Sequence, residues 1–231
     1  MTTDYKKIRE NLQKIHKRIE FAATSCGRDP ATVTLLAVSK TKPASAIRAA
    51  YDAGQIRFGE NYVQEALEKM EHLRDVAIEW HYIGGIQSNK TRPIANAFAW
   101  VHGVASLKHA RRLSEQRPEE MPPLNLCLQV NISGESSKQG VAPAELPALA
   151  SEIASLPNIQ LRGLMSLPEP TDDSQQQHQA FAGVRALFDE LNREGYGLDT
   201  LSMGMSGDLE AAIEEGSTMV RIGTAIFGAR T

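Results

Sequence analysis

This sequence has no long hydrophobic run, few cysteines and a small net charge. No stretch approaches the ~18 apolar residues that a membrane-spanning helix needs, and residues 1–5 lack the charged-then-apolar layout of a signal peptide. The two cysteines, Cys26 and Cys127, have no CxxC spacing, which predicts reduced structural thiols. A net charge of −3 does not favour a nucleic-acid or membrane binder. Together these absences predict a cytoplasmic protein without a nucleic-acid or membrane partner.

The sequence also lacks the short motifs of several common site classes. No GxGxxG follows the first expected strand, so a dinucleotide-binding fold has no support. His102, His109 and His178 show no metal-ligand spacing, and no metal is expected. There is no linker or low-complexity tract. The 231 residues, 42% of them hydrophobic and 23% charged, therefore predict one domain over 1–231 that buries its own core.

Short apolar runs predict eight strands that alternate with segments of helical periodicity. The strands are expected at 33–39, 56–59, 79–83, 100–104, 124–131, 159–164, 198–202 and 218–222. The helices are expected at 4–25, 43–53, 62–73, 88–98, 106–116, 143–155, 174–194 and 209–215, with a short turn or helix at 223–228. This alternation predicts a single (β/α)8 TIM barrel with an extra N-terminal helix, and an open doubly wound sheet is the alternative.

The first strand ends in Lys40, and Thr41, Lys42 and Pro43 follow it. A lysine at the end of a buried strand is costly because burial disfavours its charged form. The same effect on its pKa makes such a lysine a candidate for condensation with a carbonyl group to form a Schiff base. The plain structural alternative is a lysine that reaches solvent.

Polar residues also follow the other strands at their carboxyl ends, where TIM barrels carry their working groups. They are Asn61, His81 with Tyr82, Asn131 with the loop 133–140, Met165 and Ser166, residues 202–208, and residues 221–224. The barrel fold would bring these distant positions around one mouth, together with Lys40.

Small residues after the last two strands predict a phosphate site. Ser206, Gly207, Gly223 and Thr224 leave backbone N–H groups available, and Thr224 begins a short helix whose N-terminus favours an anion. A phosphate site that faces the amine of Lys40 suits a ligand with a phosphate and an aldehyde. Pyridoxal 5′-phosphate (PLP) fits, and so does a sugar-phosphate aldol substrate bound by a PLP-free aldolase-like enzyme.

Arg221 favours PLP. An arginine that faces the ring nitrogen keeps this nitrogen unprotonated, and the ring is then a weaker electron sink. The alternative is a strand-end arginine paired with Asp208 or Glu210. Lys42 and Lys138 are expected to be solvated lysines. The alternatives are that Lys42 lowers the pKa of Lys40 or receives PLP in transit, and that Lys138 is a second transfer or phosphate contact.

Several motifs together resemble the pyridoxal phosphate homeostasis protein family, from about residue 5 to the C-terminus. They are 35–43 (LLAVSKTKP), 58–65 (FGENYVQE), 81–84 (HYIG), 87–90 (QSNK), 162–165 (RGLM), 201–206 (LSMGMS) and 221–228 (RIGTAIFG). The resemblance implies a PLP barrel of fold type III, monomeric, that acts in vitamin B6 homeostasis without an established enzymatic activity. It suggests carrying or buffering of PLP, with PLP-dependent apo-enzymes as recipients.

The resemblance also implies roles for individual residues. Lys40 would hold PLP as an internal aldimine, and Arg221 would face the pyridine nitrogen. The phosphate would be bound by Ser206, Gly223 and Thr224. The ring pocket would be lined by Asn61, His81, Met165 and Ser166.

The chain is similar, too, to the barrel half of alanine racemases, so a PLP-dependent amino-acid racemase is the alternative function. Those enzymes continue into a β domain that supplies a catalytic tyrosine across a dimer interface. This sequence ends at Thr231, where the barrel closes. The second base of a racemase is therefore expected to be missing, unless Tyr82 or His81 replaces it.

Overall fold

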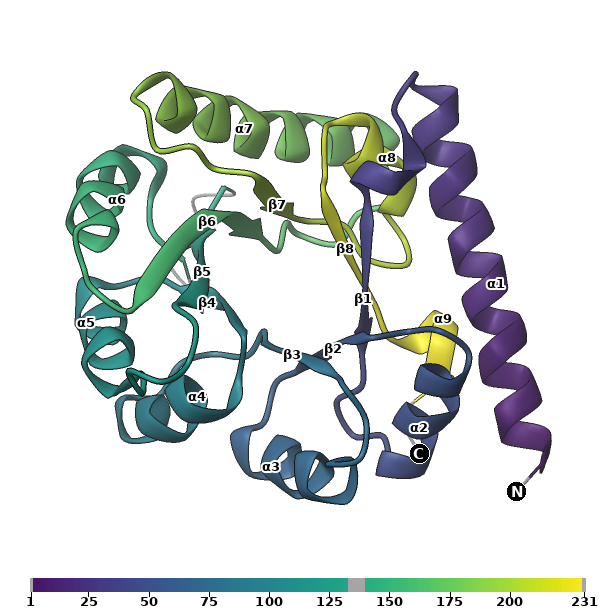
Figure 1. Ribbon diagram of the computed structural model, residues 1–231. Helices are drawn as coiled ribbons and strands as arrows, with labels where there is room; N and C mark the ends of the chain where they lie inside the picture. The colour runs from purple at the N-terminus through teal and green to yellow at the C-terminus, as the bar shows by residue number, and fades with distance from the viewer. Residues whose placement is uncertain (1, 133–139, 230–231) are drawn as a thin grey trace.

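The computed structural model describes residues 2–132 and 140–229, and it shows a ring of strands surrounded by helices (Figure 1). The strands are β1 (Thr34–Val38), β2 (Arg57–Glu60), β3 (Glu79–Tyr82), β4 (Trp100–Val104), β5 (Leu124–Val130), β6 (Ile159–Ser166), β7 (Thr200–Ser202) and β8 (Met219–Ile222). The α-helices are α1 (Thr2–Ser25), α2 (Ala44–Asp52), α3 (Val63–His72), α4 (Thr91–Ala97), α5 (Leu107–Gln116), α6 (Leu146–Ala154), α7 (Ser174–Arg193), α8 (Leu209–Glu214) and α9 (Thr224–Phe227). Short 3-10 turns are η1 (Pro30–Thr32), η2 (Ser88–Lys90) and η3 (Pro143–Glu145).

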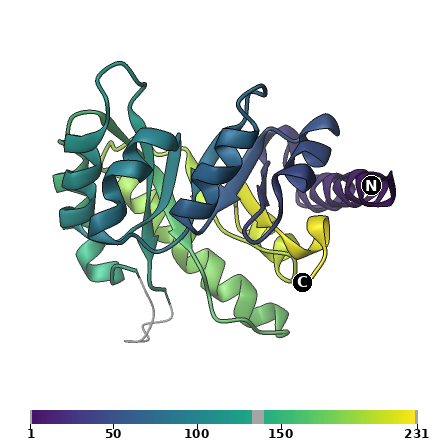
Figure 2. The same cartoon turned by 90° about the horizontal axis from the view of Figure 1, so that it is seen from below.

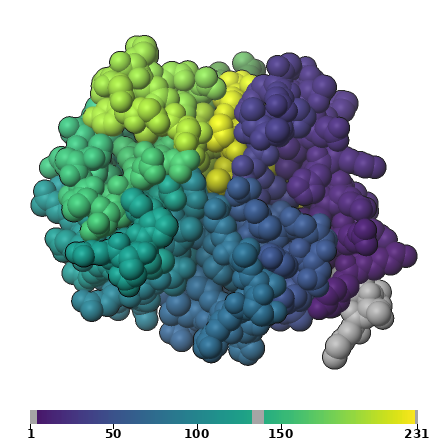
Figure 3. All heavy atoms as spheres, viewed as in Figure 1, coloured from purple at the N-terminus to yellow at the C-terminus, as the bar shows by residue number. Residues whose placement is uncertain are grey.

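The eight strands form a closed parallel barrel in sequence order, and β8 pairs with β1. The predicted (β/α)8 barrel is thus confirmed, and the open sheet is wrong because the first and last strands are hydrogen-bonded. In the space-filling view the colours follow one another around the molecule, and the N-terminal segment lies beside the C-terminal one (Figure 3). Strand ends far apart in sequence therefore meet at one mouth.

Strand residues alternate between the helix layer and the barrel interior. Leu35 and Ala37 of β1 belong to the main apolar core between strands and helices, while Leu36 between them is fully buried and pairs in register with Arg221. A separate small apolar cluster of Trp100, Cys127 and Met165 completes the core. Burying one large apolar side chain stabilises a fold by about 1.5–3 kcal/mol, so the large outer cluster contributes more than the three residues of the small one.

Helix α1 lies outside the ring and packs against α2, α8 and α9, where Figure 2 shows it almost end-on. Its apolar stripe, Ile8, Leu12, Ile15 and Ile19, is buried against these helices. The helix ends at Ser25, and Gly27 just beyond it adopts a φ of 75°, which suits the left-handed position after a helix. No helix in the part of the chain that the structure describes has the length and apolar character of a membrane span.

Two strand boundaries differ from the sequence prediction by two residues, and the others lie within one residue of it. Met165 and Ser166, expected to open a loop, are the last residues of β6, because they pair with Gln129 and Val130 of β5. Strand β7 begins only at Thr200 instead of 198. Pairing with a neighbouring strand extends or shortens an element, and apolar patterning along one segment does not contain that information.

Candidate functional site

Lys40 follows β1 at the carboxyl end of the barrel, as the sequence predicts, and is half-buried. The chain turns sharply there: the N–H of Lys42 donates to Ser39 O at 3.0 Å, and Thr41 has a φ of 64°. A positive φ is uncommon for a β-branched residue and costs roughly 1–3 kcal/mol. The strained turn must be held by its surroundings, and it presents Lys40 at the mouth.

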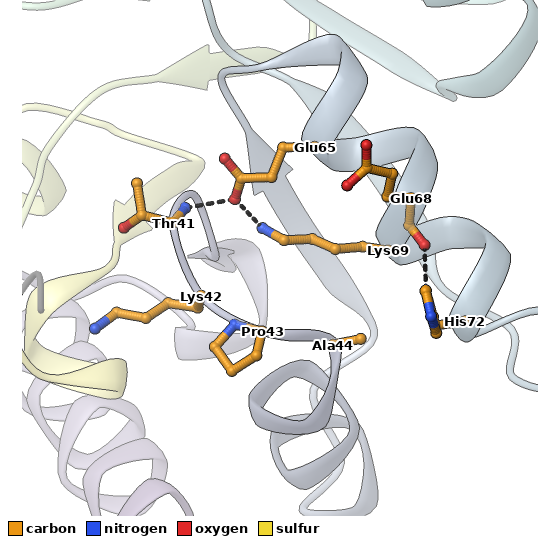
Figure 4. Close-up of a pocket in the computed structure, with 8 residues that line it drawn as sticks. All are labelled: Thr41, Lys42, Pro43, Ala44, Glu65, Glu68, Lys69 and His72. Carbon is orange, nitrogen blue, oxygen red and sulfur yellow. Dashed lines mark hydrogen bonds and ion pairs between the residues drawn. The ribbon is translucent and has the colours of Figure 1, made fainter.

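A buried ion-pair network holds this turn from both sides of Lys40. Lys69 Nζ donates to Ser39 O at 2.9 Å and contacts Glu60 Oε1 at 2.8 Å and Glu65 Oε1 at 2.5 Å. The hydroxyl of Ser39 donates to Glu60 at 2.6 Å, and the N–H of Thr41 donates to Glu65 at 2.6 Å. Figure 4 shows Glu65 between Thr41 and Lys69, with Lys42 on the other side of the loop. The backbone before and after Lys40 is therefore fixed by charged side chains.

The network is buried deeply enough to affect ionisation. The side chains of Lys69 and Glu60 are 7% and 0% exposed. Burial raises the pKa of Glu60, although Lys69 and Ser39 oppose the effect, and Oε2 of Glu60 has no hydrogen-bond partner. Sequence reasoning missed this network. The sequence feature that could have revealed the network is Lys69, which occupies a core-facing position of α3 four residues after Glu65.

Arg221 lies on β8 next to β1 and is 5% exposed. Its Nη1 donates to Ser202 O and to Ser202 Oγ, the latter at 2.9 Å, and its Nη2 donates to Ser166 O at 2.8 Å. Burial lowers the pKa of Arg221 to about 10, so the guanidinium stays charged at neutral pH. None of these contacts uses Nε, which leaves donor capacity for a ligand.

The carboxylates considered as partners of Arg221 are engaged elsewhere. Glu210 forms an ion pair with Arg18 of α1 at 2.8 Å. Asp208 accepts a hydrogen bond from the N–H of Met205 at 2.5 Å within its own turn. Arg221 is thus a buried donor between β6 and β7, and the surface-pair interpretation is wrong.

The residues predicted to line a ring pocket fall into two groups. Asn61, Met165 and Ser166 stand at the carboxyl ends of β2 and β6, and two buried polar atoms there, Asn61 Oδ1 and Ser166 Oγ, have no hydrogen-bond partner. Buried polar atoms are normally satisfied, so unpaired ones at a barrel mouth indicate a ligand that completes them. His81 lies inside β3, is 0% exposed, and contacts Glu79 and His102. Its contact with a ligand stays a prediction.

Gly223 and Thr224 follow β8 directly, and Ser206 follows β7. The N–H groups of Ile226 and Phe227 both donate to Gly223 O at 2.9 Å, which forms the turn of α9 and leaves its first N–H groups without an intrahelical partner. A Cβ added to Gly223 would lie 3.0 Å from Val38 O. A glycine there lets the backbone of the proposed phosphate loop approach β1 closely.

Helix α1 holds both loops of the predicted phosphate site. Asn11 Nδ2 donates to Ile226 O of α9 at 2.9 Å. Arg18 Nη2 donates to Ser206 O at 3.2 Å, and the same guanidinium pairs with Glu210. The extra N-terminal helix therefore positions the predicted phosphate loops, a role that its amphipathic pattern alone did not reveal.

Of the two further lysines, only Lys42 can be placed. Its Nζ donates to Ala229 O at 2.7 Å, which draws the C-terminal end of the described chain to the turn after β1. Lys138 lies outside the described residues.

Comparison with known proteins gives consistent matches over the whole length. The family model for the alanine racemase N-terminal domain matches residues 4–231. The pyridoxal phosphate homeostasis protein of Pseudomonas aeruginosa is 64% identical over 223 residues, covering 96% of each chain. That of Escherichia coli is 53% identical over 226 residues, covering 96% of this chain and 97% of the relative. The structure of PipY from Synechococcus elongatus with PLP bound has a TM-score of 0.83 and 38% identity, covering 96% of this chain and all of PipY.

Proposed function

The chain belongs to the alanine racemase N-terminal domain family and, within it, to the pyridoxal phosphate homeostasis proteins, and from this premise we propose that it binds PLP and takes part in intracellular PLP homeostasis. The Pseudomonas aeruginosa and Escherichia coli relatives, which match over nearly their full length, are named as homeostasis proteins. PipY, with the same fold, is described with PLP bound.

One observation carries the proposal: the fixed turn of Lys40, the buried Arg221 and the unpaired atoms Asn61 Oδ1 and Ser166 Oγ gather at the carboxyl end of one barrel. When bound, PLP supplies an aldehyde for an amine and an electron-withdrawing ring. Lys40 would anchor the aldehyde covalently. Arg221, which can only donate hydrogen bonds, would hold the pyridine nitrogen unprotonated.

The remaining groups fit the rest of the cofactor. The phosphate would be held by Ser206, Gly223 and Thr224, since the first N–H groups of α9 lack intrahelical partners. Asn61 and Ser166 would satisfy their unpaired oxygens against the ring substituents, Met165 would pack against the ring, and His81 would support it from within the barrel.

We further propose that the protein carries or buffers PLP in the cytoplasm, as a monomer, and delivers it to PLP-dependent apo-enzymes. The test mixes the PLP-loaded protein with an apo-enzyme and measures recovered activity, with the same concentration of free PLP as reference. Recovery faster than release of PLP into a trapping reagent supports direct delivery. Recovery limited by that release rate contradicts it.

Reconstitution tests PLP binding itself. The protein mixed with PLP should turn yellow, lose its visible absorption on borohydride reduction, and retain one reduced pyridoxyl adduct on the peptide that contains Lys40. A protein that stays colourless after reconstitution contradicts the proposal. Borohydride trapping with sugar phosphates but not with PLP would indicate the aldolase-like alternative, and chiral inversion of amino acids by the loaded protein would indicate a racemase.

Replacing Arg18 with alanine is expected to weaken PLP binding by roughly threefold to tenfold, because the loss of its hydrogen bond to Ser206 O costs about 1 kcal/mol. Titration of the visible absorption measures the change. Arg9→Ala is the matched control, since Arg9 lies on the exposed face of the same helix. Equal affinities of the two variants would show that α1 does not support the phosphate loop.

A further inference from the structure

A continuous chain of polar contacts crosses the interior of the barrel, and the proposed function leaves most of it unexplained. It starts at Arg221, which donates to Ser202 Oγ. Ser202 Oγ lies 2.8 Å from His102 Nδ1, and His102 Nε2 lies 3.0 Å from His81 Nδ1. His81 Nε2 lies 2.9 Å from Glu79 Oε1. We name this series, from Arg221 to Glu79, the barrel chain.

The barrel chain joins the two ends of the barrel. His102 on β4 reaches Ser202 on β7, strands that are not neighbours, so this contact passes through the interior. Both imidazoles are 0% exposed. Glu79, at the other end, is 37% exposed and pairs with Arg57 at 2.9 Å, beside a cavity of about 390 Å³ at the amino-terminal mouth. TIM-barrel interiors are usually filled by branched aliphatic side chains, so a polar connection through this one needs a reason.

The charged ends determine the direction of every hydrogen bond. Hydrogen bonding to His81 is the main cause that lowers the pKa of Glu79, and the ionised carboxylate can only accept, so His81 Nε2 must carry a proton. Burial lowers the pKa values of both histidines, which favours neutral rings. His81 Nδ1 then accepts from His102 Nε2–H, and His102 Nδ1 accepts from the hydroxyl of Ser202. That hydroxyl oxygen accepts from Arg221, so every donor points from the guanidinium toward the carboxylate.

We infer that His81 and His102 are positioning residues for Arg221, and that the barrel chain transmits the charge of Glu79 from the amino-terminal mouth to the PLP ring. The carboxylate polarises each successive hydrogen bond, as chains of hydrogen bonds do in a low-dielectric interior. Ser202 Oγ is thereby a stronger acceptor, and Arg221 donates less strongly to the ring nitrogen. The inference rests on the proposed function, because the ring is the group that responds.

Other titratable groups surround the barrel chain and are part of its electrostatics. Trp100 stacks on His81 with ring centroids 5.4 Å apart and lies under the guanidinium of Arg162 at 4.8 Å. The groups that face the chain from neighbouring elements are Arg57 on β2, Cys127 on β5, Arg162 on β6 with its partner Asp199, and Asp208 after β7, whose charge acts on Arg221. Burial raises the pKa of the Cys127 thiol to about 12, so near neutral pH it adds no charge.

The first test needs no cofactor. Nitrogen-15 NMR of the histidine rings in the PLP-free protein should assign His81 and His102 as neutral rings protonated at Nε2 near neutral pH. In Glu79→Gln this assignment should persist, because the amide oxygen can still accept from His81. An Nδ1-protonated ring or a doubly protonated ring in the wild type overturns the proposed direction of the chain, whether or not PLP binds.

The second test uses the PLP-loaded protein. The visible absorption of bound PLP changes with pH as its imine loses a proton. In Glu79→Gln the midpoint of this change should fall by roughly 0.3–1 pH unit, since a more positive Arg221 disfavours a protonated imine nearby. His102→Phe, which interrupts the chain, should shift the midpoint in the same direction. The double variant should shift it no further than either single variant, because both changes act on one path. Glu71→Gln, which removes a carboxylate from an exposed ion pair with Arg74, is the charge control.

The outcomes separate the two hypotheses. A wild-type protein that does not bind PLP contradicts the proposed function, while the NMR assignment still tests the chain. Unchanged midpoints in both single variants, with normal PLP binding, show that the barrel chain is structural only. Additive shifts in the double variant also overturn the inference, since Glu79 and His102 would then act independently.

Discussion

Replacement of Lys40 by alanine is expected to abolish covalent attachment of PLP and to leave the protein colourless. Among the lysines that the structure describes, no other is presented in the same way: Lys40 follows β1 on a turn that Ser39 and Thr41 fix through the Lys69 network. Weak binding through the phosphate loops should remain. We expect the affinity for PLP to fall at least about a hundredfold, which corresponds to ~2.7 kcal/mol, measured by equilibrium dialysis with detection of PLP.

Lys42→Ala is the matched control for this prediction. Lys42 lies two residues away, but its Nζ points to Ala229 O and not into the barrel (Figure 4). The variant should keep its yellow colour and its borohydride adduct on Lys40. If Lys40→Ala still forms a reducible adduct while Lys42→Ala does not, the assignment of the anchor to Lys40 is wrong.

The barrel itself was predictable because each of its signals is local. Apolar runs such as that of β1 alternate with segments of helical periodicity. Because connections between parallel strands are right-handed, eight such strand–helix units can be arranged in few ways. Barrel closure then places any residue that follows a strand at one mouth. This is how Lys40, Asn61, Arg221 and Thr224 could be proposed as one site from positions spread over the whole chain.

The supports of the site were not predictable, because they depend on contacts between distant segments. His102 and Ser202 are 100 positions apart and meet only across a closed barrel. Arg18 reaches Ser206 only because α1 packs beside α8. Alternation along a strand shows which residues share a face, and it does not show which residue of another strand they meet.

Lys69→Met is expected to lower the free energy of unfolding by about 3–5 kcal/mol, because it leaves the carboxylate of Glu60 buried without a counter-ion. In a domain of this size each kcal/mol corresponds to about 2–4 °C, so the melting temperature should fall by roughly 10 °C. The side chain of Glu60 is 0% exposed, whereas that of Glu65 is 29% exposed and can turn to water. Thermal unfolding of the PLP-free protein measures the effect, and an unchanged melting temperature would contradict it.

The double variant Lys69→Met, Glu60→Gln separates stability from the positioning of Lys40. A neutral amide removes the isolated charge, so at least half of the lost stability should return, as expected when both members of a buried pair are replaced. The carbonyl of Ser39 still loses the hydrogen bond from Lys69 Nζ and keeps the one from the N–H of Lys42. The double variant should therefore form the borohydride adduct on Lys40 more slowly than the wild type although it is stably folded. A wild-type rate in this variant would mean that the network stabilises the barrel without positioning Lys40.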